Sequence, residues 1–274
     1  MKITAADVNK LRQQTGAGMM DCKKALQEAE GDFQAAIDHL RKQGQKVAAK
    51  RSDRDAKEGL VIAKVANGGG QGALIVLNCE TDFVAKNDDF HVVANTIMDV
   101  ALNNAPADLD ALKAMDYGDG LNIADKITEQ IGKIGEKIEL STYEKVNADS
   151  VIAYNHPGNR LASIVGFTKE ATGDIGRDVA MQVAAMAPVA VNADGVSPDV
   201  IAKELEIGKD LAIQEGKPAE MAEKIAKGRL GKFLKEATLL SQPFIKDNKM
   251  TIDQYLRASD KDLTVTEFRR VALN

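Results

Sequence analysis

Tryptophan is absent from this sequence of 274 residues, and aromatic residues make up only 4% of it. Aliphatic side chains, alanine and nine methionines must therefore fill the interior, which favours packed helices and small sheets over an aromatic-lined ligand pocket. The longest apolar run, residues 183–191, is interrupted by Pro188 and falls far short of the roughly 20 residues that a membrane helix needs. The N-terminus has no apolar segment of the kind that directs secretion. We therefore expect a soluble, cytoplasmic protein that does not bind membranes.

Residues that bind metals or carry out covalent catalysis are scarce. The two cysteines, Cys22 and Cys79, both have apolar sequence neighbours, so we expect buried, reduced thiols. The three histidines, His39, His91 and His156, have no paired metal-ligand spacing. The sequence contains neither a phosphate-binding Walker loop nor a Gly-x-Ser-x-Gly nucleophile motif. We therefore expect no metal, no cofactor and no enzymatic activity.

Positive charge is not in excess. The chain has 36 Lys and Arg residues against 41 Asp and Glu residues, a net charge of −5, so no global field draws it to nucleic acids. Residues 41–57 form a local basic stretch, and RNA binding through it is one hypothesis. This stretch lacks the interleaved aromatic residues on which bases stack. We favour its interpretation as a solvated linker and expect no direct nucleic-acid binding.

The spacing of apolar residues divides the chain into three predicted parts. Three-to-four spacing within residues 4–42 predicts three short helices, the first capped by Thr4 and ended by Gly16. From Leu60 the spacing becomes two, which predicts strands. The predicted domains are a helical bundle with its linker (1–54), an α+β unit (55–148), and a second α+β unit (149–274) that carries an antiparallel helical hairpin at 199–240.

The two predicted α+β units follow a similar order of elements. In each, two predicted strands flank a turn and a helix comes next; the turn of the second unit contains His156. The fragment Val-Ile-Ala recurs at residues 61–63 and 151–153. We therefore predict a duplicated unit with small antiparallel sheets. The helix after the second hairpin is expected to present one apolar face, made of Ile175, Val179, Val183 and Met186.

One segment, Glu80–Asn87, combines acidic, aromatic and aliphatic residues at a predicted strand-to-helix corner. Such a corner presents side chains to solvent on a rigid support, and Asp82 and Phe83 offer a hydrogen-bond acceptor beside a large apolar side chain. The alternative is that Phe83 folds back into the core beneath a helix. Met19 and Met20 pose the same choice, between core filling and an adaptable contact surface.

Two motifs together resemble a known family. The run LRQQTGAGMMDCKKAL at residues 11–26, with Gly31–Asp32 after it, and the motif TDFVAK at residues 81–86 closely resemble bacterial elongation factor Ts. The similarity continues, in the family's order, through Tyr154–His156, Gly216–Pro218 and Gln242–Phe244. It implies an α+β fold with an N-terminal ubiquitin-associated-type bundle of three helices, two related α+β subdomains and an inserted antiparallel helical hairpin.

The resemblance also implies a function and a partner. The family acts as the guanine-nucleotide exchange factor of elongation factor Tu, a GTPase of peptide elongation, and does no covalent chemistry. By carry-over of matching positions, a segment that disturbs the Mg²⁺ and phosphate site of the partner would comprise Thr81, Asp82, Phe83 and Val84. A helix of the GTPase domain would be gripped by Arg12, Met19 and Met20, and His156 would add a further contact. Proteobacterial members continue past the last strand into a helix that also contacts the partner, so we do not expect that contact from a chain that ends at residue 274.

A third hypothesis, a ubiquitin-like adaptor, is suggested by the N-terminal bundle alone. Under it, deletion of residues 1–54 would abolish all binding, whereas an exchange factor would lose only part of its binding.

Overall fold

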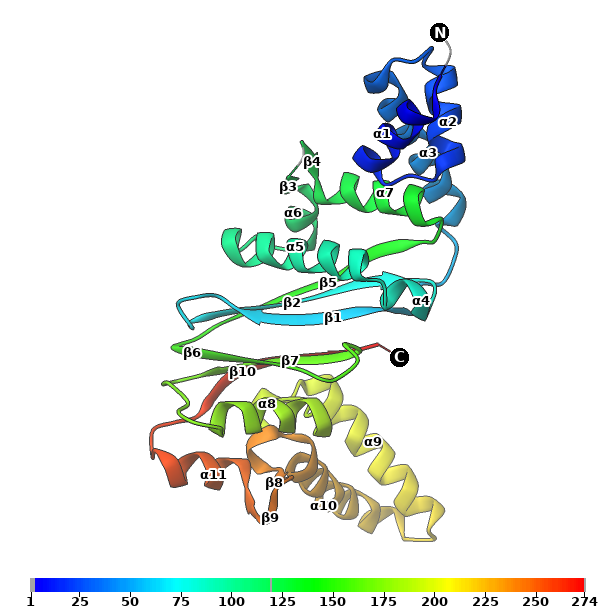
Figure 1. Ribbon diagram of the computed structural model, residues 1–274. Coiled ribbons are helices and arrows are strands. Elements are labelled where there is room, and N and C mark those ends of the chain that lie inside the picture. The colour runs from blue at the N-terminus through cyan, green and yellow to red at the C-terminus, as the bar shows by residue number, and fades with distance from the viewer. Residues whose placement is uncertain (1–2, 119, 274) are drawn as a thin grey trace.

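Two three-stranded antiparallel sheets pack face to face at the centre of the computed structural model, which describes residues 3–118 and 120–273 (Figure 1). Helices cover the outer face of each sheet, and a bundle formed by the first helices stands on one of these helical layers. The predicted α+β class and its small antiparallel sheets are therefore confirmed.

The N-terminal bundle consists of α1 (Ala5–Thr15), α2 (Met19–Glu28) and the first half of α3 (Phe33–Arg51). Thr4 and Asp7 exchange hydrogen bonds in a capping box at the start of α1. Gly16 ends this helix at φ 67°, a left-handed conformation that glycine adopts without strain. Leu11 and Leu26 are fully buried in the small aliphatic core. The three-helix prediction, its cap and its stop are confirmed.

The predicted linker at residues 41–57 is wrong. Helix α3 runs through most of it to Arg51, and only residues 52–57 separate this helix from the first strand. The second half of α3 lies against α7 (Ile123–Ile134), where Gly44 is buried, and Val47 and Ala48 pack on the core of the first α+β unit. Because a glycine lets two helices pack closely, such a helix needs few large apolar residues. Its sequence therefore resembles that of a solvent-exposed linker.

The first α+β unit is built on a sheet with the strand order β1-β2-β5, in which both pairs are antiparallel. Strand β2 is buried on both faces, because one face meets helices and the other meets the second sheet. Phe90, Ile97 and Met98 of α5 fill the space between the helices and the sheet. The elements of this unit are β1 (Glu58–Val65), β2 (Gln71–Cys79), α4 (Asp82–Ala85), α5 (Asp88–Asn104), α6 (Leu109–Ala114), β3 (Asp116–Gly118), β4 (Leu121–Asn122), α7 and β5 (Ile138–Asn147).

The second unit repeats the topology of the first. In both sheets the last strand pairs with the second strand of the hairpin, which gives the orders β1-β2-β5 and β10-β7-β6. A short two-stranded hairpin followed by a helix also recurs, as β3-β4-α7 and as β8-β9-α11. The predicted pair of related subdomains is thus confirmed. The elements are β6 (Ser150–Asn155), β7 (Leu161–Phe167), α8 (Ile175–Met186), α9 (Pro198–Gln214), α10 (Ala219–Ala237), β8 (Pro243–Phe244), β9 (Asp247–Thr251), α11 (Ile252–Ser259) and β10 (Val265–Ala272).

Helices α9 and α10 form the predicted antiparallel hairpin, which projects from the second unit (Figure 1). Small residues let the two helices approach closely: a Cβ built on Gly208 would lie 3.2 Å from the Cα of Ala226. The hairpin lies between α8 and β8, where the first unit has only the six-residue helix α6.

One residue of the predicted apolar face of α8, Met186, is exposed. It is the last residue of the helix, and Ala187 then turns the chain in a left-handed conformation. The boundaries after residues 54 and 148 stay predictions; they fall between α3 and β1 and between β5 and β6, and the outer bounds at residues 1 and 274 lie outside the described part of the chain. Among residues 3–118 and 120–273, no helix is both long and apolar enough to cross a membrane.

Candidate functional site

Phe83 is the most exposed large apolar side chain of the described residues, with 83% of its surface accessible. It occupies the second position of α4, the four-residue helix that follows β2. The alternative in which this ring folds back into the core is therefore wrong. An aromatic ring exposed to water at the end of a sheet contributes no apolar burial to folding, and it is available to a partner.

The neighbours of Phe83 hold α4 against the first unit. Val84 is half-buried and packs on the core, and Ala85 is buried. The hydroxyl of Thr81 caps the helix by accepting a hydrogen bond from the N–H of Val84 at 3.5 Å. The ring of His91 in α5 meets the carbonyl of Ala85 at 3.0 Å. The helix is thus fixed while its aromatic side chain stays free.

Asp82, beside Phe83, is an exposed and ionised acceptor. Lys86 lies one turn away and donates to its Oδ2 at 2.6 Å. This hydrogen bond holds the pKa of Asp82 below its ordinary value. Because both side chains are exposed, the pair is weak, and the carboxylate can exchange Lys86 for donors of a partner at little cost.

A second exposed apolar surface lies on the N-terminal bundle. Met19 and Met20 begin α2 directly after the Gly16–Gly18 turn, and 56% and 62% of their surfaces are accessible. They are therefore surface residues and not core filler. Arg12 is exposed on α1.

The third predicted contact, His156, is exposed in the turn between β6 and β7. Its Nδ1 lies 3.0 Å from the hydroxyl of Tyr154. The preceding residue, Asn155, fixes this turn to the first sheet, since its side chain accepts from the N–H of Ala63 and donates to the carbonyl of the same residue, both at 2.8 Å.

These segments lie along one side of the molecule. The bundle, α4 and the β6–β7 turn all face the same edge in Figure 1. Contacts agree with the picture: Arg160 of the turn pairs with Glu58, and Glu58 is the strand partner of Cys79, three residues before Asp82. Residues from three distant parts of the sequence thus form one discontinuous edge.

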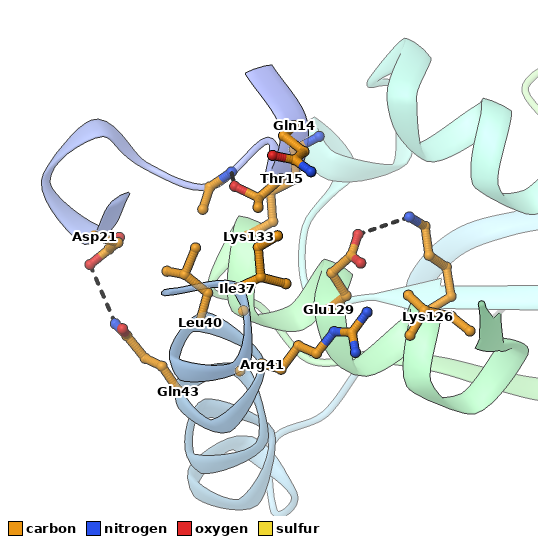
Figure 2. Close-up of a pocket in the computed structure, with 14 residues that line it drawn as sticks. Gln14, Thr15, Asp21, Ile37, Leu40, Arg41, Gln43, Lys126, Glu129 and Lys133 are labelled. Carbon is orange, nitrogen blue, oxygen red and sulfur yellow. Dashed lines mark hydrogen bonds and ion pairs between the residues drawn. The ribbon is translucent and has the colours of Figure 1, made fainter. Parts of the chain in front are cut away.

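A pocket of about 420 Å³ opens where the bundle meets α7, and none of the eight predicted site residues lines it (Figure 2). Four of its polar side chains are paired with one another: Lys126 donates to Glu129 at 2.8 Å and Gln43 to Asp21 at 3.3 Å. The pocket lies at the interface between the bundle and the core. The linker prediction did not include such an interface.

Neither of the two cysteine thiols is exposed. Both thiols are free and buried, and burial raises the pKa of Cys79 to about 12 and that of Cys22 above its ordinary value. Within residues 3–118 and 120–273, no three His, Cys, Asp or Glu side chains gather as a metal site requires.

Comparison with known proteins gives this edge a family context. The family model described as Elongation factor TS matches residues 80–274. The chain belongs to the elongation factor Ts family. Among curated relatives, the Elongation factor Ts of Christiangramia forsetii is 53% identical and that of Amoebophilus asiaticus 52% identical, each over 99% of both chains. The Elongation factor Ts of Porphyromonas gingivalis is 48% identical over all of this chain and 99% of its own.

Membership in the elongation factor Ts family confirms the resemblance drawn from the two sequence motifs. The roles of the eight residues stay predictions, and the structure adds what the sequence did not reveal. Glu136, which contacts Thr81, was not singled out, because it lies 55 positions from that residue and no local pattern links the two.

Proposed function

We propose that this protein is the guanine-nucleotide exchange factor of elongation factor Tu in cytoplasmic translation elongation. It catalyses no covalent reaction and acts only by binding the GTPase. The observation that carries the proposal is the exposed ring of Phe83, held on a fixed corner and beside the ionised carboxylate of Asp82. Family membership supplies the identity of the partner.

The mechanism is negative coupling between two ligands of one GTPase. GDP with Mg²⁺ stabilises one conformation of the GTPase, and this chain binds a different one. Linkage then requires that the chain weakens GDP binding by the same factor by which GDP weakens binding of the chain. No chemical step is needed for nucleotide to leave faster.

Phe83 supplies the difference in affinity between the two conformations. Its ring gains apolar burial only where elements of the GTPase have moved apart to admit it. Asp82 either holds donors at a helix end of the GTPase or disfavours the Mg²⁺-bound geometry. Thr81 and Val84 keep the corner in place beneath these two side chains.

The other exposed residues provide affinity away from the nucleotide. Met19 and Met20, with Arg12 beside them on the bundle, grip a helix of the GTPase domain, and His156 makes a third contact. Because α3 packs on α7, the bundle and α4 are presented together, so the second contact needs no search by a flexible tether.

RNA binding by the basic stretch receives less support. Arg51 of this stretch is bound to Glu80, and Lys57 pairs with Asp55. We therefore expect no direct nucleic-acid partner.

Titration calorimetry tests the coupling. The chain is titrated into elongation factor Tu, first free of nucleotide and then with saturating GDP and Mg²⁺. We expect saturating GDP to raise the dissociation constant of the chain for the GTPase. A saturating amount of the chain should raise the dissociation constant of GDP by the same factor. Equal affinity of the chain for both forms would contradict the proposal.

A further inference from the structure

Glu80 and Glu136 form a pair of reciprocal hydrogen bonds, here called the clasp, between the end of β2 and the start of β5. The carboxylate of Glu80 accepts the backbone N–H of Lys137 at 2.7 Å, and the carboxylate of Glu136 accepts the backbone N–H of Thr81 at 3.0 Å. Each glutamate therefore binds the N–H of the residue that follows the other. These two hydrogen bonds join the end of β2 to the start of β5 immediately before α4 begins.

Glu136 makes a second contact that sets the helix cap. The hydroxyl of Thr81 donates its one hydrogen to Oε1 of Glu136 at 2.7 Å. Its lone pairs are thereby turned toward α4, where they accept from Val84. Both oxygens of Glu136 are used, so an amide in its place, with a single acceptor, would leave one donor of Thr81 without its partner.

Arg51 connects the same clasp to the bundle. Its Nη1 lies 2.9 Å from both carboxylate oxygens of Glu80, whose side chain is only 15% exposed. Arg51 is the last residue of α3, the helix that begins in the bundle. A charge-assisted contact of this kind is stronger than an exposed ion pair.

The ring of Phe83 cannot orient itself. It is 83% exposed, and a helix of four residues is far too short to be stable alone. The direction of α4 must therefore come from its cap and from the segment that leads into it. We infer that Glu136 and Glu80 are positioning residues for Phe83, and that Arg51 ties their clasp to the N-terminal bundle.

The inference rests on the proposed exchange function but has a readout that does not need the partner. Because the chain has no tryptophan, Phe83→Trp places a single tryptophan at the site, which is excited at wavelengths that the tyrosines do not absorb. Time-resolved anisotropy then measures how freely the ring moves. We expect Phe83→Trp/Glu136→Gln to show a larger amplitude of nanosecond motion than Phe83→Trp alone. Equal amplitudes in the two variants would overturn the inference.

Exchange kinetics provide the second readout. Glu136→Gln should lower the maximal rate of GDP release at saturating chain about tenfold, the effect of losing one hydrogen bond to a charged group, while the half-saturating concentration changes little. The control is Glu223→Gln, the same change at an exposed carboxylate of α10, and it should leave both values unaltered. If Glu136→Gln does not fold, Glu80→Gln breaks the other half of the clasp and is measured instead.

The two proposals fail differently. If Phe83→Ala abolishes exchange but both clasp variants exchange like the parent, the positioning role is wrong and the exchange function stands. If the parent does not accelerate GDP release at all, the exchange function is wrong, and the anisotropy still decides whether the clasp orients position 83.

Discussion

Gly44 of α3 and Gly132 of α7 face each other so closely that a Cβ built on Gly132 would lie 2.8 Å from the Cα of Gly44. Two helix backbones meet here without side chains between them, in the way that small residues permit. The contact fixes the N-terminal bundle on the core. The bundle therefore keeps a fixed position relative to the first α+β unit, which carries α4.

The first prediction concerns this crossing. Gly132→Ala should lower the free energy of unfolding by about 1–3 kcal/mol, because the new methyl group has backbone in its path and α3 must move away. Urea titration followed by circular dichroism measures it.

Gly231→Ala is the matched control for that variant. Gly231 lies in the middle of α10 with open space around it, so alanine there should raise stability by about 0.5–1 kcal/mol through helix propensity alone. If Gly132→Ala stabilised the chain as Gly231→Ala does, the close crossing would be contradicted.

The second prediction separates affinity from exchange. In Met19→Ala/Met20→Ala, the concentration of chain that half-saturates GDP release should rise about tenfold, since apolar contact area is lost far from the nucleotide. The maximal rate should stay close to that of the parent. Met221→Ala, which truncates a similarly exposed methionine on α10, should change neither value. A loss of maximal rate with unchanged half-saturation would assign the methionines to the exchange step instead.

The third prediction concerns the thiols. Cys79 is fully buried, its pKa is raised to about 12, and its Sγ donates to the carbonyl of Thr81 at 3.1 Å. Iodoacetamide at pH 8 should therefore leave Cys79 unmodified in the folded chain and alkylate it once the chain is unfolded. Peptide mass spectrometry locates the label. Alkylation of Cys79 in the native state at the rate of a free thiol would show that the corner opens readily.

The fourth prediction follows from the pKa of Glu80. Burial alone would raise this pKa, but the hydrogen bonds from Lys137 and Arg51 outweigh burial and hold the pKa below its ordinary value of 4.5. Since the folded state binds this proton less readily than the unfolded state, Glu80 stabilises the fold above pH 4.5, and the contribution is lost as the pH falls. The melting temperatures of the parent and Glu80→Gln should therefore converge in acid. A gap that stayed constant throughout the acid range would exclude the carboxylate as its cause.

Local signals in the sequence predicted the elements whose ends and faces are determined locally. Thr4 and Gly16 bound α1 as their capping chemistry requires, and the apolar alternation from Leu60 predicted the first hairpin. Long-range contacts were not predictable in this way. The second half of α3 is a helix because α7 covers it, and the orientation of α4 depends on Glu136, far along the chain.

The site was predicted only in part, because it too depends on long-range contacts. The local sequence left both an exposed and a buried Phe83 open, because nothing nearby tells which face of a four-residue helix meets the core. Val84 and Ala85 take the buried positions, and the ring is left outside. The arrangement of the bundle, α4 and the β6–β7 turn along one edge follows from the packing of α3 on α7 and from contacts between the two units, which no single segment encodes.

The most direct test of the account is the release of fluorescent GDP from elongation factor Tu of the same organism, with excess unlabelled GDP and increasing amounts of this chain. We expect strong acceleration by the parent and by Ile213→Ala, which truncates an exposed aliphatic residue of α9. Phe83→Ala should lower the maximal rate about 10- to 100-fold, because full burial of a phenylalanine ring is worth roughly 1.5–3 kcal/mol, and its melting temperature should match that of the parent. Undiminished acceleration by Phe83→Ala, or none by the parent with both proteins folded, would contradict the account.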